Sequence, residues 1–334
     1  MTLTFGVIGA GDFGERHLQV LAAHPSAEIA WVCDRDAGRA QQMAERYGGR
    51  PTTDLAEVLQ DPAVQAVSVL TPEHVHCEQV LAALAAGKDV LVEKPVTTSA
   101  QEAAALQLKV RETGRIVMPA HISRFIPSYA KAREYLGPQG LGNPVSIHAR
   151  RNVPRERLAL HNRIHPVFMA LSHDIDLVLS YVKSEPRRVV AMERKTDPAL
   201  QNPDIFWGLV EFENGCIAAL ETLWVLPNSA CYVDAAMEIA TPGGVVHVRY
   251  PSDALWLDLP QGHAFPDPAI FDTVNGEIFG ALRDEISYFI RCVERREEPS
   301  VVTLQDAVTG LRIAEALVTA ARERREVRLE AGAP

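Results

Sequence analysis

The chain has 334 residues, a length that fits two domains better than a single hydrophobic core. Hydrophobic residues make up 47% of it and charged residues 23%, which places it among globular proteins rather than disordered ones. The formal net charge of −10 excludes a chain-wide basic surface of the kind that binds nucleic acid.

Cysteine usage and hydropathy exclude further classes of protein. The cysteines are widely spaced and form no CxxC pair, so we expect neither a disulfide framework nor a metal site. The first residues, MTLTFGVIGAG, lack the basic segment of a signal peptide, and no apolar run reaches the roughly 18 residues of a membrane span. We therefore expect a cytoplasmic protein. The five cysteines are Cys33, Cys77, Cys216, Cys231 and Cys292.

The first 120 residues alternate strand-like and helix-like segments. Short apolar runs predict strands at 5–8, 28–33, 66–70, 90–92 and 116–120. Amphipathic segments predict helices at 15–23, 37–47, 73–86 and 100–113. Ser99 is expected to cap the last of these, with Glu102 completing a capping box. This alternation is typical of an α/β fold, here a doubly wound parallel sheet of Rossmann type over residues 1–121.

The sharpest motif is a GxGxxG pattern between the first strand and the first helix. Its first glycine allows a tight turn, the second lets the backbone approach a pyrophosphate, and the third permits close packing of helix on sheet. The free N–H groups at the start of the helix then bind phosphate oxygens. The pattern alone is weak, and a degenerate site or another nucleotide is the alternative. The residues expected to bind the cofactor here are Gly9, Gly11, Asp12, Phe13 and Gly14.

An acidic residue strengthens the prediction of a dinucleotide. Asp34 lies 20 residues after Gly14, at the end of the second strand, where a carboxylate accepts hydrogen bonds from the adenine ribose. Because that carboxylate repels a 2′-phosphate, NAD is favoured as cofactor. Arg35 beside it could stack on adenine or tolerate NADP, so NADP stays open.

Two more segments follow strands at the same edge of the sheet, where open α/β sheets bind ligands. The first is TPEHVH, in which Thr71, Pro72, His74 and His76 are cofactor-site candidates. The second contains Glu93 and Lys94, and we expect Lys94 to meet both nicotinamide and substrate; a solvated surface lysine is the alternative. His74, His76 and Cys77 do not form a metal site, because positions i and i+2 of a helix do not share a face.

The pattern changes after about residue 123. A helix is expected at 168–182, followed by strands at 189–194, 207–212, 217–224, 235–240 and 245–250. Turns are expected at 213–215 and 242–244, and helices at 278–295 and 304–324. Residues 122–334 are thus predicted to form an α+β domain with a large, mostly antiparallel open sheet, and helix 304–324 to pack back on the Rossmann domain.

Several motifs together resemble the glucose–fructose oxidoreductase/inositol dehydrogenase/MocA (Gfo/Idh/MocA) family, over nearly the whole chain. They are GVIGAGDFGERH (6–17), TPEHVH (71–76), EKP (93–95), SRFIPSY (123–129), HDIDL (173–177) and REEPSVVTLQDAVTGLRIAEAL (296–317). The resemblance implies an NAD- or NADP-dependent enzyme acting on sugars, cyclitols or nucleotide-linked sugars. It also implies a Rossmann domain followed by an open sheet often used for oligomerisation, here as a homodimer or homotetramer.

The resemblance also implies roles for individual residues. Lys94 corresponds to the lysine of the EKP motif and His173 to the catalytic histidine. Met169 stands where the family frequently has an aspartate, so the triad of lysine, aspartate and histidine is incomplete. His161 or His165 could partly substitute for the missing carboxylate.

Alcohol oxidation explains why these residue types are needed. The nicotinamide accepts a hydride, and the protein must position the carbinol and take its proton. Histidine suits that task because its ordinary pKa lies near 6.5. We therefore expect His173 to be the general base and Lys94 to stabilise the developing alkoxide; an ordinary helix histidine is the alternative for His173.

The substrate prediction rests on arginines. Arg150, Arg151, Arg155, Arg157 and Arg163 precede the expected catalytic helix, and guanidinium groups bind phosphates bidentately. A nucleotide-linked amino sugar such as UDP-N-acetylglucosamine, oxidised at C3, is therefore favoured over a free sugar or cyclitol; a solvated strand edge or a subunit contact is the alternative for the run. The residues expected to bind substrate are Lys94, Arg124, Arg151, Arg163, His165, Met169 and His173.

Two further functions stay open at this point. A sensor that binds dinucleotide without catalysis would need neither Lys94 nor His173, so their presence argues against it. A reductase of an imine or enone shares the fold, and the HDID histidine disfavours it.

Overall fold

The computed structural model describes residues 2–158, 163–228, 233–251, 255, 257–260, 262–264, 266 and 268–330. The chain divides into two compact units. The first comprises Met1–Ile126 and Pro268–Val308, and the second Pro127–Asp267 and Thr309–Pro334. The division expected from sequence, between residues 121 and 122, keeps 268–308 in the second domain, whereas the structure groups this segment with the first.

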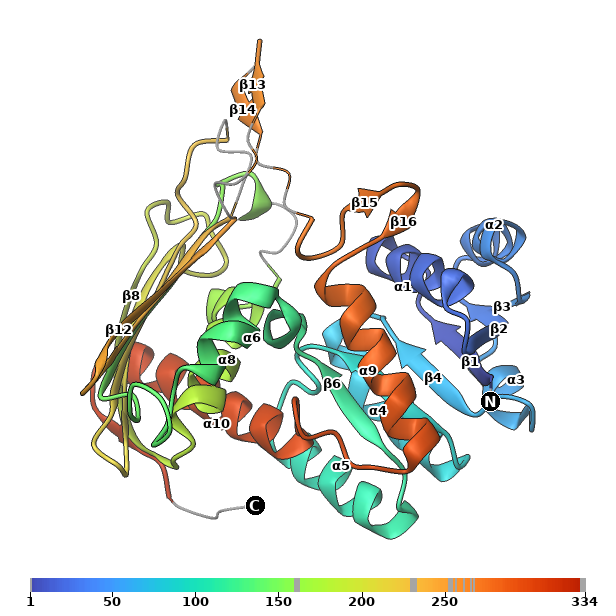
Figure 1. Cartoon of the computed structure of the whole chain (residues 1–334), viewed down its shortest axis with the longest axis horizontal. Coiled ribbons are helices and arrows are strands. Elements are labelled where there is room, and N and C mark those ends of the chain that lie inside the picture. The colour runs from blue at the N-terminus through green and yellow to red at the C-terminus, as the bar shows by residue number, and fades with distance from the viewer. Residues whose placement is uncertain are drawn as a thin grey trace. The chain divides into compact units, whose positions relative to one another are not determined.

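The first unit contains a six-stranded sheet in the order β3-β2-β1-β4-β5-β6, in which every neighbouring pair is parallel. The strands are β1 (Leu3–Ile8), β2 (Ala27–Cys33), β3 (Arg50–Thr52), β4 (Ala66–Val69), β5 (Asp89–Glu93) and β6 (Val117–Ala120). The helices are α1 (Asp12–Ala23), α2 (Ala37–Tyr47), α3 (Leu55–Gln60), η1 (Glu73–Val75), α4 (His76–Ala85), α5 (Ala100–Thr113), η2 (Ile122–Phe125) and α9 (Ala281–Arg295). This arrangement confirms the predicted Rossmann sheet (Figure 1).

Both faces of this sheet are covered by helices, which explains the continuous apolar runs of its central strands. Every residue of β4 is buried. On one face, side chains from β4 and β5 form a core with α3, α4 and α5. On the other face, α9 packs beside α1, and the rings of Phe5 and Phe289 lie 6.1 Å apart.

The predicted start of α5 is confirmed in detail. The backbone N–H of Glu102 donates to the side chain of Ser99 at 3.2 Å, so Ser99 is the N-cap. The Glu102 carboxylate reaches back to the N–H of Thr98 at 3.1 Å rather than to that of Ser99. Ser99 and Glu102 thus satisfy two backbone N–H groups at the start of the helix. The arrangement differs from a capping box in that Glu102 accepts from the residue before the N-cap.

The second unit contains a seven-stranded sheet in the order β12-β11-β7-β10-β9-β8-β17. Its strands are β7 (Ser146–Asn152), β8 (Pro186–Arg194), β9 (Ile205–Phe212), β10 (Ile217–Leu223), β11 (Asp234–Thr241), β12 (Gly244–Tyr250) and β17 (Val327–Arg328). The β7–β10 pair is parallel and the other pairs are antiparallel, so the sheet is mixed and mostly antiparallel, as predicted. Strand β7 is an interior strand that sequence patterning missed.

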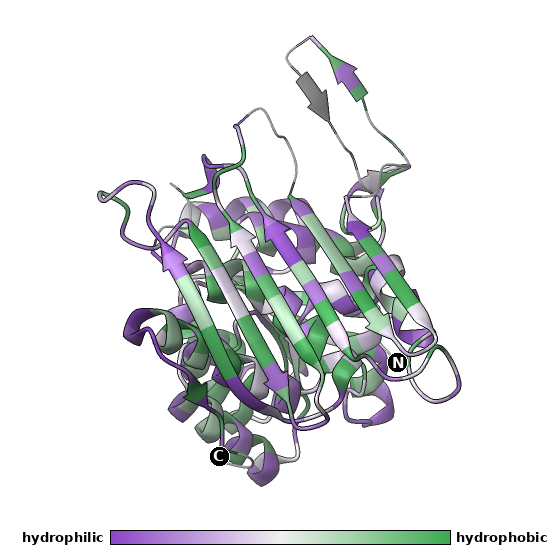
Figure 2. Ribbon diagram, turned by 90° about the vertical axis from the view of Figure 1, so that its left-hand side faces the viewer, coloured by the Kyte–Doolittle hydropathy of each residue, from purple (hydrophilic) through white to green (hydrophobic). Residues whose placement is uncertain are grey.

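Helices cover one face of this sheet. They are α6 (Pro127–Glu134), the π-helical turn η3 (Val167–Leu171), α8 (Ser172–Val182) and the second part of α10 (Leu304–Glu323). Gly208 of β9 faces α10 so closely that a Cβ there would lie 2.7 Å from Leu317. Strand β9 alternates buried and outward residues, as a half-covered sheet requires. Figure 2 looks onto the uncovered face and shows hydrophobic residues among polar ones.

The turn at 213–215 is confirmed between β9 and β10. Gly215 has φ of 84°, and its N–H donates to the carbonyl of Phe212 at 2.9 Å. Two short hairpins, β13 (Leu257–Leu259) with β14 (Gly262–Ala264) and β15 (Thr273–Val274) with β16 (Glu277–Ile278), precede α9.

The expectations about cysteines and about membrane-spanning helices can be compared with the described residues. Cys33, Cys77, Cys216 and Cys292 are buried free thiols, and Cys231 lies outside the described residues. Among the described helices, none is long and apolar enough to cross a membrane.

Candidate functional site

The glycine loop between β1 and α1 has the close backbone approaches that its motif predicts. Gly9 has φ of 96°, and a Cβ there would lie 2.8 Å from the Leu70 backbone. A Cβ on Gly14 would lie 2.1 Å from the Gly9 carbonyl oxygen. Any side chain at these two positions would push α1 away from the sheet, so the loop fixes where the helix begins.

Gly11 differs from its two neighbours in the motif. Apart from its chain neighbours and the backbone of its own helix, no atom of the described residues lies within 4 Å of the position that its Cβ would occupy. Gly11 is the N-cap of α1, and no side chain caps the free N–H groups of that helix. The backbone N–H groups at the start of α1 face open space that suits a pyrophosphate. The glycine loop therefore fits the phosphates of a dinucleotide.

Asp34 follows β2 and is only 7% exposed. One carboxylate oxygen accepts the N–H of Ala10 at 2.8 Å, and the other accepts the N–H of Asp36 at 2.9 Å. The carboxylate therefore braces the glycine loop from the neighbouring strand. This fixes the carboxylate at the edge of the sheet where it is expected to meet a ribose hydroxyl.

A second arginine beside Asp34 was missed by sequence reasoning. Arg39, on the first turn of α2, places Nη1 3.4 Å from the Asp34 carboxylate. Arg35, the arginine named from the sequence, is exposed. Arg39 lies five residues after Asp34. The two side chains meet because the chain turns at Asp36, between the end of β2 and the start of α2, and sequence spacing alone does not indicate this.

His76 links the two other loops at this edge of the sheet. Its Nε2 lies 2.7 Å from the carbonyl oxygen of Thr71, and its Nδ1 lies 2.9 Å from that of Pro95. The ring is 1% exposed, and burial lowers its pKa, an effect that these hydrogen bonds partly oppose. Its side chain therefore braces the loop rather than reaching a ligand, whereas His74 and Pro72 are exposed.

Glu93 and Lys94 end β5 beside this loop. One Glu93 oxygen accepts the backbone N–H of Lys94 at 3.2 Å. The other lies 3.9 Å from Nε2 of His17, a fully buried residue of α1 whose Nδ1 lies 3.0 Å from Ser68 Oγ. Burial lowers the pKa of His17 to about 3 and raises the pKa of Glu93 to about 7. Sequence reasoning missed His17, although it ends the first family motif.

The segment that returns from the second half of the sequence contributes an aromatic contact. Phe13 of the glycine motif packs edge-on against Phe271, with ring centroids 6.0 Å apart. The Arg16 guanidinium lies over the Phe271 ring at 4.1 Å. Residues before β15 thus pack on the first turns of α1, which no local sequence signal predicts.

In the second unit, His173 lies on the first turn of α8, just after the π-helical turn, and is partly buried. Asp174 next to it is fully buried and accepts two hydrogen bonds from Arg151 of β7, at 2.8 and 3.1 Å. Burial alone would lower the pKa of Arg151, but the Asp174 carboxylate outweighs it and the pKa is raised. This ion pair fixes the first turn of α8, and with it His173, against the sheet.

The position of the missing aspartate is apolar. Met169 packs against a cluster that contains Val153, Ala170 and Trp224. His165 does not supply a replacement, because its Nδ1 accepts the N–H of Val167 at 3.2 Å and its Nε2 lies 3.0 Å from Glu193. His161 lies outside the described residues.

Most of the arginines expected to bind phosphate have carboxylate partners. Besides Arg151, Arg150 contacts Asp234 at 3.1 Å and Arg155 lies 4.0 Å from Asp204. Arg124 belongs to the first unit, where its buried Nη1 donates to Val301 at 2.8 Å and to Asp306 at 2.9 Å. Arg157 and Arg163 are exposed.

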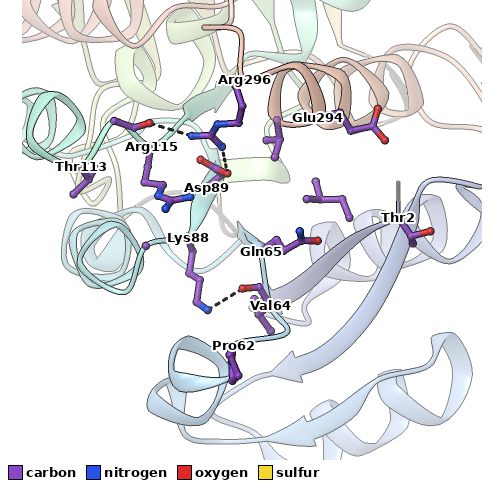
Figure 3. Close-up of a pocket in the computed structure, with 14 residues that line it drawn as sticks. Thr2, Pro62, Val64, Gln65, Lys88, Asp89, Thr113, Arg115, Glu294 and Arg296 are labelled. Carbon is purple, nitrogen blue, oxygen red and sulfur yellow. Dashed lines mark hydrogen bonds and ion pairs between the residues drawn. The ribbon is translucent and has the colours of Figure 1, made fainter.

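A cavity of about 640 Å³ lies elsewhere on the first unit (Figure 3). Its lining includes Leu3 at the start of β1, Asp89 at the start of β5 and Arg115 just before β6. It therefore opens at the amino ends of the strands, whereas the glycine loop, Asp34 and Lys94 follow their carboxyl ends. The cavity is not the cofactor site.

With this geometry in place, comparison with known proteins gives the family. Residues 3–121 match the model of an oxidoreductase family with an NAD-binding Rossmann fold, and residues 129–247 match that of the GFO/IDH/MocA C-terminal domain. The chain belongs to the Gfo/Idh/MocA family. It is an NAD-dependent dehydrogenase that acts on CH–OH groups.

Relatives within the family cover this chain to different extents. The scyllo-inositol 2-dehydrogenase of Bacillus subtilis is 28% identical over 97% of this chain and 95% of its own length. An inositol 2-dehydrogenase of Saccharopolyspora erythraea is 30% identical over 75% of both chains. The UDP-N-acetylglucosamine 3-dehydrogenase of Acidithiobacillus ferrooxidans is 33% identical over 67% of this chain and 68% of its own.

Among solved structures, the scyllo-inositol dehydrogenase of Lactobacillus casei with bound NAD(H) and scyllo-inositol has the same fold. Its TM-score is 0.85 at 19% identity, covering 98% of this chain and 99% of that one. At this identity the likeness establishes the fold of both units and nothing finer.

Proposed function

We propose that this dehydrogenase oxidises a ring hydroxyl of a free cyclitol or sugar, in the manner of an inositol dehydrogenase. The observation that carries the proposal is the pairing of Arg150, Arg151 and Arg155 with carboxylates. The partners of Arg151 and Arg155 are fully buried, whereas Asp234 is 34% exposed. A guanidinium already paired with a buried carboxylate is a poor partner for a diphosphate, because binding would strand the carboxylate. The nucleotide-linked amino sugar favoured by the sequence thereby loses its main support.

The extent of the matches supports the same conclusion. The relative named a scyllo-inositol 2-dehydrogenase covers 97% of the chain, whereas the relative named a UDP-N-acetylglucosamine 3-dehydrogenase covers 67%. That second relative keeps the nucleotide sugar as the alternative substrate, since it has the higher identity, 33% against 28%.

We assign the chemistry to Lys94 and His173. Bound NAD accepts the hydride, and the glycine loop with Asp34 holds it at the edge of the sheet. His173 takes the hydroxyl proton as general base, and the Lys94 ammonium stabilises the developing negative charge on oxygen. The Arg151–Asp174 ion pair keeps the helix turn that carries His173 in place.

The substrate assignment is tested by NADH formation with purified enzyme. We expect turnover with myo-inositol, scyllo-inositol or glucose, and little with UDP-N-acetylglucosamine. His173→Ala serves as the control for contaminating dehydrogenases. Turnover confined to the nucleotide sugar would overturn the proposal and support the alternative.

We also propose that the uncovered sheet face forms a homo-oligomer contact. Its outward side chains include Met192 at 80% exposed and Trp207 at 45%, which face each other across β8 and β9. Val190, Leu209, Ile217 and Val245 are 41–52% exposed on the strands of the same sheet. Large exposed apolar side chains gathered on one face of a sheet are typical of a protein interface.

A further inference from the structure

We propose that His17 is a positioning residue that holds Glu93 as a neutral carboxylic acid next to Lys94. The inference rests on the proposed role of Lys94 at the substrate oxygen and extends it to two residues that do not themselves react. The observation behind it is a chain of three side chains from three elements: the fully buried Ser68 of β4 and His17 of α1, and the largely buried Glu93 of β5, which is 14% exposed.

The geometry of the ring defines which atom faces the acid. Nδ1 of His17 lies 3.0 Å from Ser68 Oγ, while Nε2 is buried and has no hydrogen-bond partner among the described residues. The nearest carboxyl oxygen, Oε1 of Glu93, is 3.9 Å from that Nε2. With the ring proton on Nδ1 and donated to Ser68, Nε2 presents a lone pair toward Glu93.

A protonated Glu93 completes this arrangement. Its O–H can donate to Nε2 after an approach of about 1 Å, which satisfies a buried nitrogen that is otherwise orphaned. Its other oxygen already accepts the backbone N–H of Lys94. An ionised Glu93 facing the same lone pair would place two acceptors against each other, which burial makes costly.

Burial favours the same protonation states, against the charge of Lys94. From α1 the group facing Glu93 is His17, and from the end of its own strand it is Lys94. Burial raises the pKa of Glu93 to about 7, although Lys94 opposes this, and burial keeps His17 neutral by lowering its pKa to about 3.

A neutral neighbour has a consequence for Lys94. A carboxylate at position 93 would attract the Lys94 ammonium and offset its charge, whereas a carboxylic acid does not. His17 therefore acts on the reaction through Glu93, without touching substrate or cofactor.

Infrared spectroscopy tests the proposal without any turnover. The C=O stretch of a carboxylic acid is separate from that of a carboxylate, so full-length enzyme below and above pH 7 gives a difference spectrum. We expect an acid band that disappears with a midpoint near the pKa of about 7 and is absent in Glu93→Gln. Glu285, a fully buried acid in the same unit, supplies the control, because Glu285→Gln should keep that band.

The role of His17 is tested by the position of the same band. A carboxylic acid that loses its hydrogen-bond acceptor absorbs at higher frequency, so His17→Phe should shift the band upward. His17→Gln, whose terminal oxygen can accept, should shift it back. A wild-type enzyme without the acid band, or a band at the same frequency in His17→Phe, would overturn the proposal.

The two proposals fail in distinguishable ways. If Lys94→Ala retains turnover while the acid band behaves as expected, the assignment of Lys94 fails and the His17–Glu93 arrangement stands. If Lys94→Ala is inactive and the band is absent, the catalytic assignment stands and the positioning role fails.

Discussion

Arg151 donates two hydrogen bonds to Asp174, the residue that follows the proposed general base His173. Arg151 lies on β7 and Asp174 on α8, and the Asp174 side chain is fully buried. The pair joins the sheet of the second unit to the helical turn that carries His173. The same ion pair therefore stabilises the fold and holds the proposed general base in place.

Breaking this pair should be costly. Asp174→Asn leaves a buried guanidinium without its counterion, and we expect the free energy of unfolding to fall by about 3–5 kcal/mol. Denaturant unfolding measures it. Arg151→Met combined with Asp174→Leu removes both charges and should recover most of that loss. A double variant as unstable as Asp174→Asn would mean that packing, and not the uncompensated charge, dominates.

The catalytic assignment predicts separate effects on turnover and cofactor binding. His173→Ala and Lys94→Ala should each lower kcat by about 100-fold or more, because each removes a group that acts on the reacting oxygen. NAD affinity, measured by calorimetry, should persist in His173→Ala. Near-normal turnover in either variant would remove that residue from the mechanism.

Asp34 should govern cofactor affinity and preference. Asp34→Asn weakens the brace on Ala10 and removes the charge that repels a 2′-phosphate, so NAD binding should weaken by about tenfold while NADP binding improves. Asp36→Asn is the matched control, because asparagine caps α2 as well as aspartate does. Equal effects from the two substitutions would contradict the assignment.

His17 and Glu93 should have opposite effects on the pH dependence of stability. The pKa of Glu93 is raised from 4.5 to about 7, so the native state binds the extra proton and stability falls as pH rises through this window. The pKa of His17 is lowered from 6.5 to about 3, so the unfolded state binds the extra proton and stability rises with pH. Between about pH 4.5 and 6.5 the two slopes cancel.

Removing Glu93 should therefore leave the pH dependence of stability that His17 contributes. In Glu93→Gln the free energy of unfolding should rise relative to wild type by about 1.4 kcal/mol for each pH unit across that window. Denaturant midpoints at several pH values measure the difference, in which all other titrating groups cancel. Parallel curves for the two proteins would show that Glu93 has an ordinary pKa.

The uncovered sheet face gives a prediction about assembly. A charge among its exposed apolar residues, in Met192→Arg or Trp207→Arg, should convert the oligomer to monomer, as read by light scattering. Leu108→Arg is the control, since Leu108 is 52% exposed on α5 of the first unit. A wild-type protein that is already monomeric would refute the proposed contact.

Local pattern determined most of the Rossmann sheet, but not that residues 268–308 belong to the first unit. The GxGxxG motif, the alternation of apolar runs and the capping at Ser99 act over a few residues, so the sequence alone indicated the Rossmann sheet and its cofactor edge. The short edge strand β3 and helix α3 were missed, since three to six residues carry too little periodicity to stand out.

The tertiary structure determines which charged side chains pair when the partners are far apart in the sequence. Strand β7 reads SIHARRN, and its inward Arg151 looks like a surface residue until Asp174 is brought beneath it. Arg124 was expected to bind substrate, yet its side chain is buried and its partner Asp306 is 182 residues away. Whether an arginine is available for a ligand or pairs with a carboxylate depends on which side chain the folded chain places beside it. Sequence fixes the charge of each group, and only the fold selects its counterion.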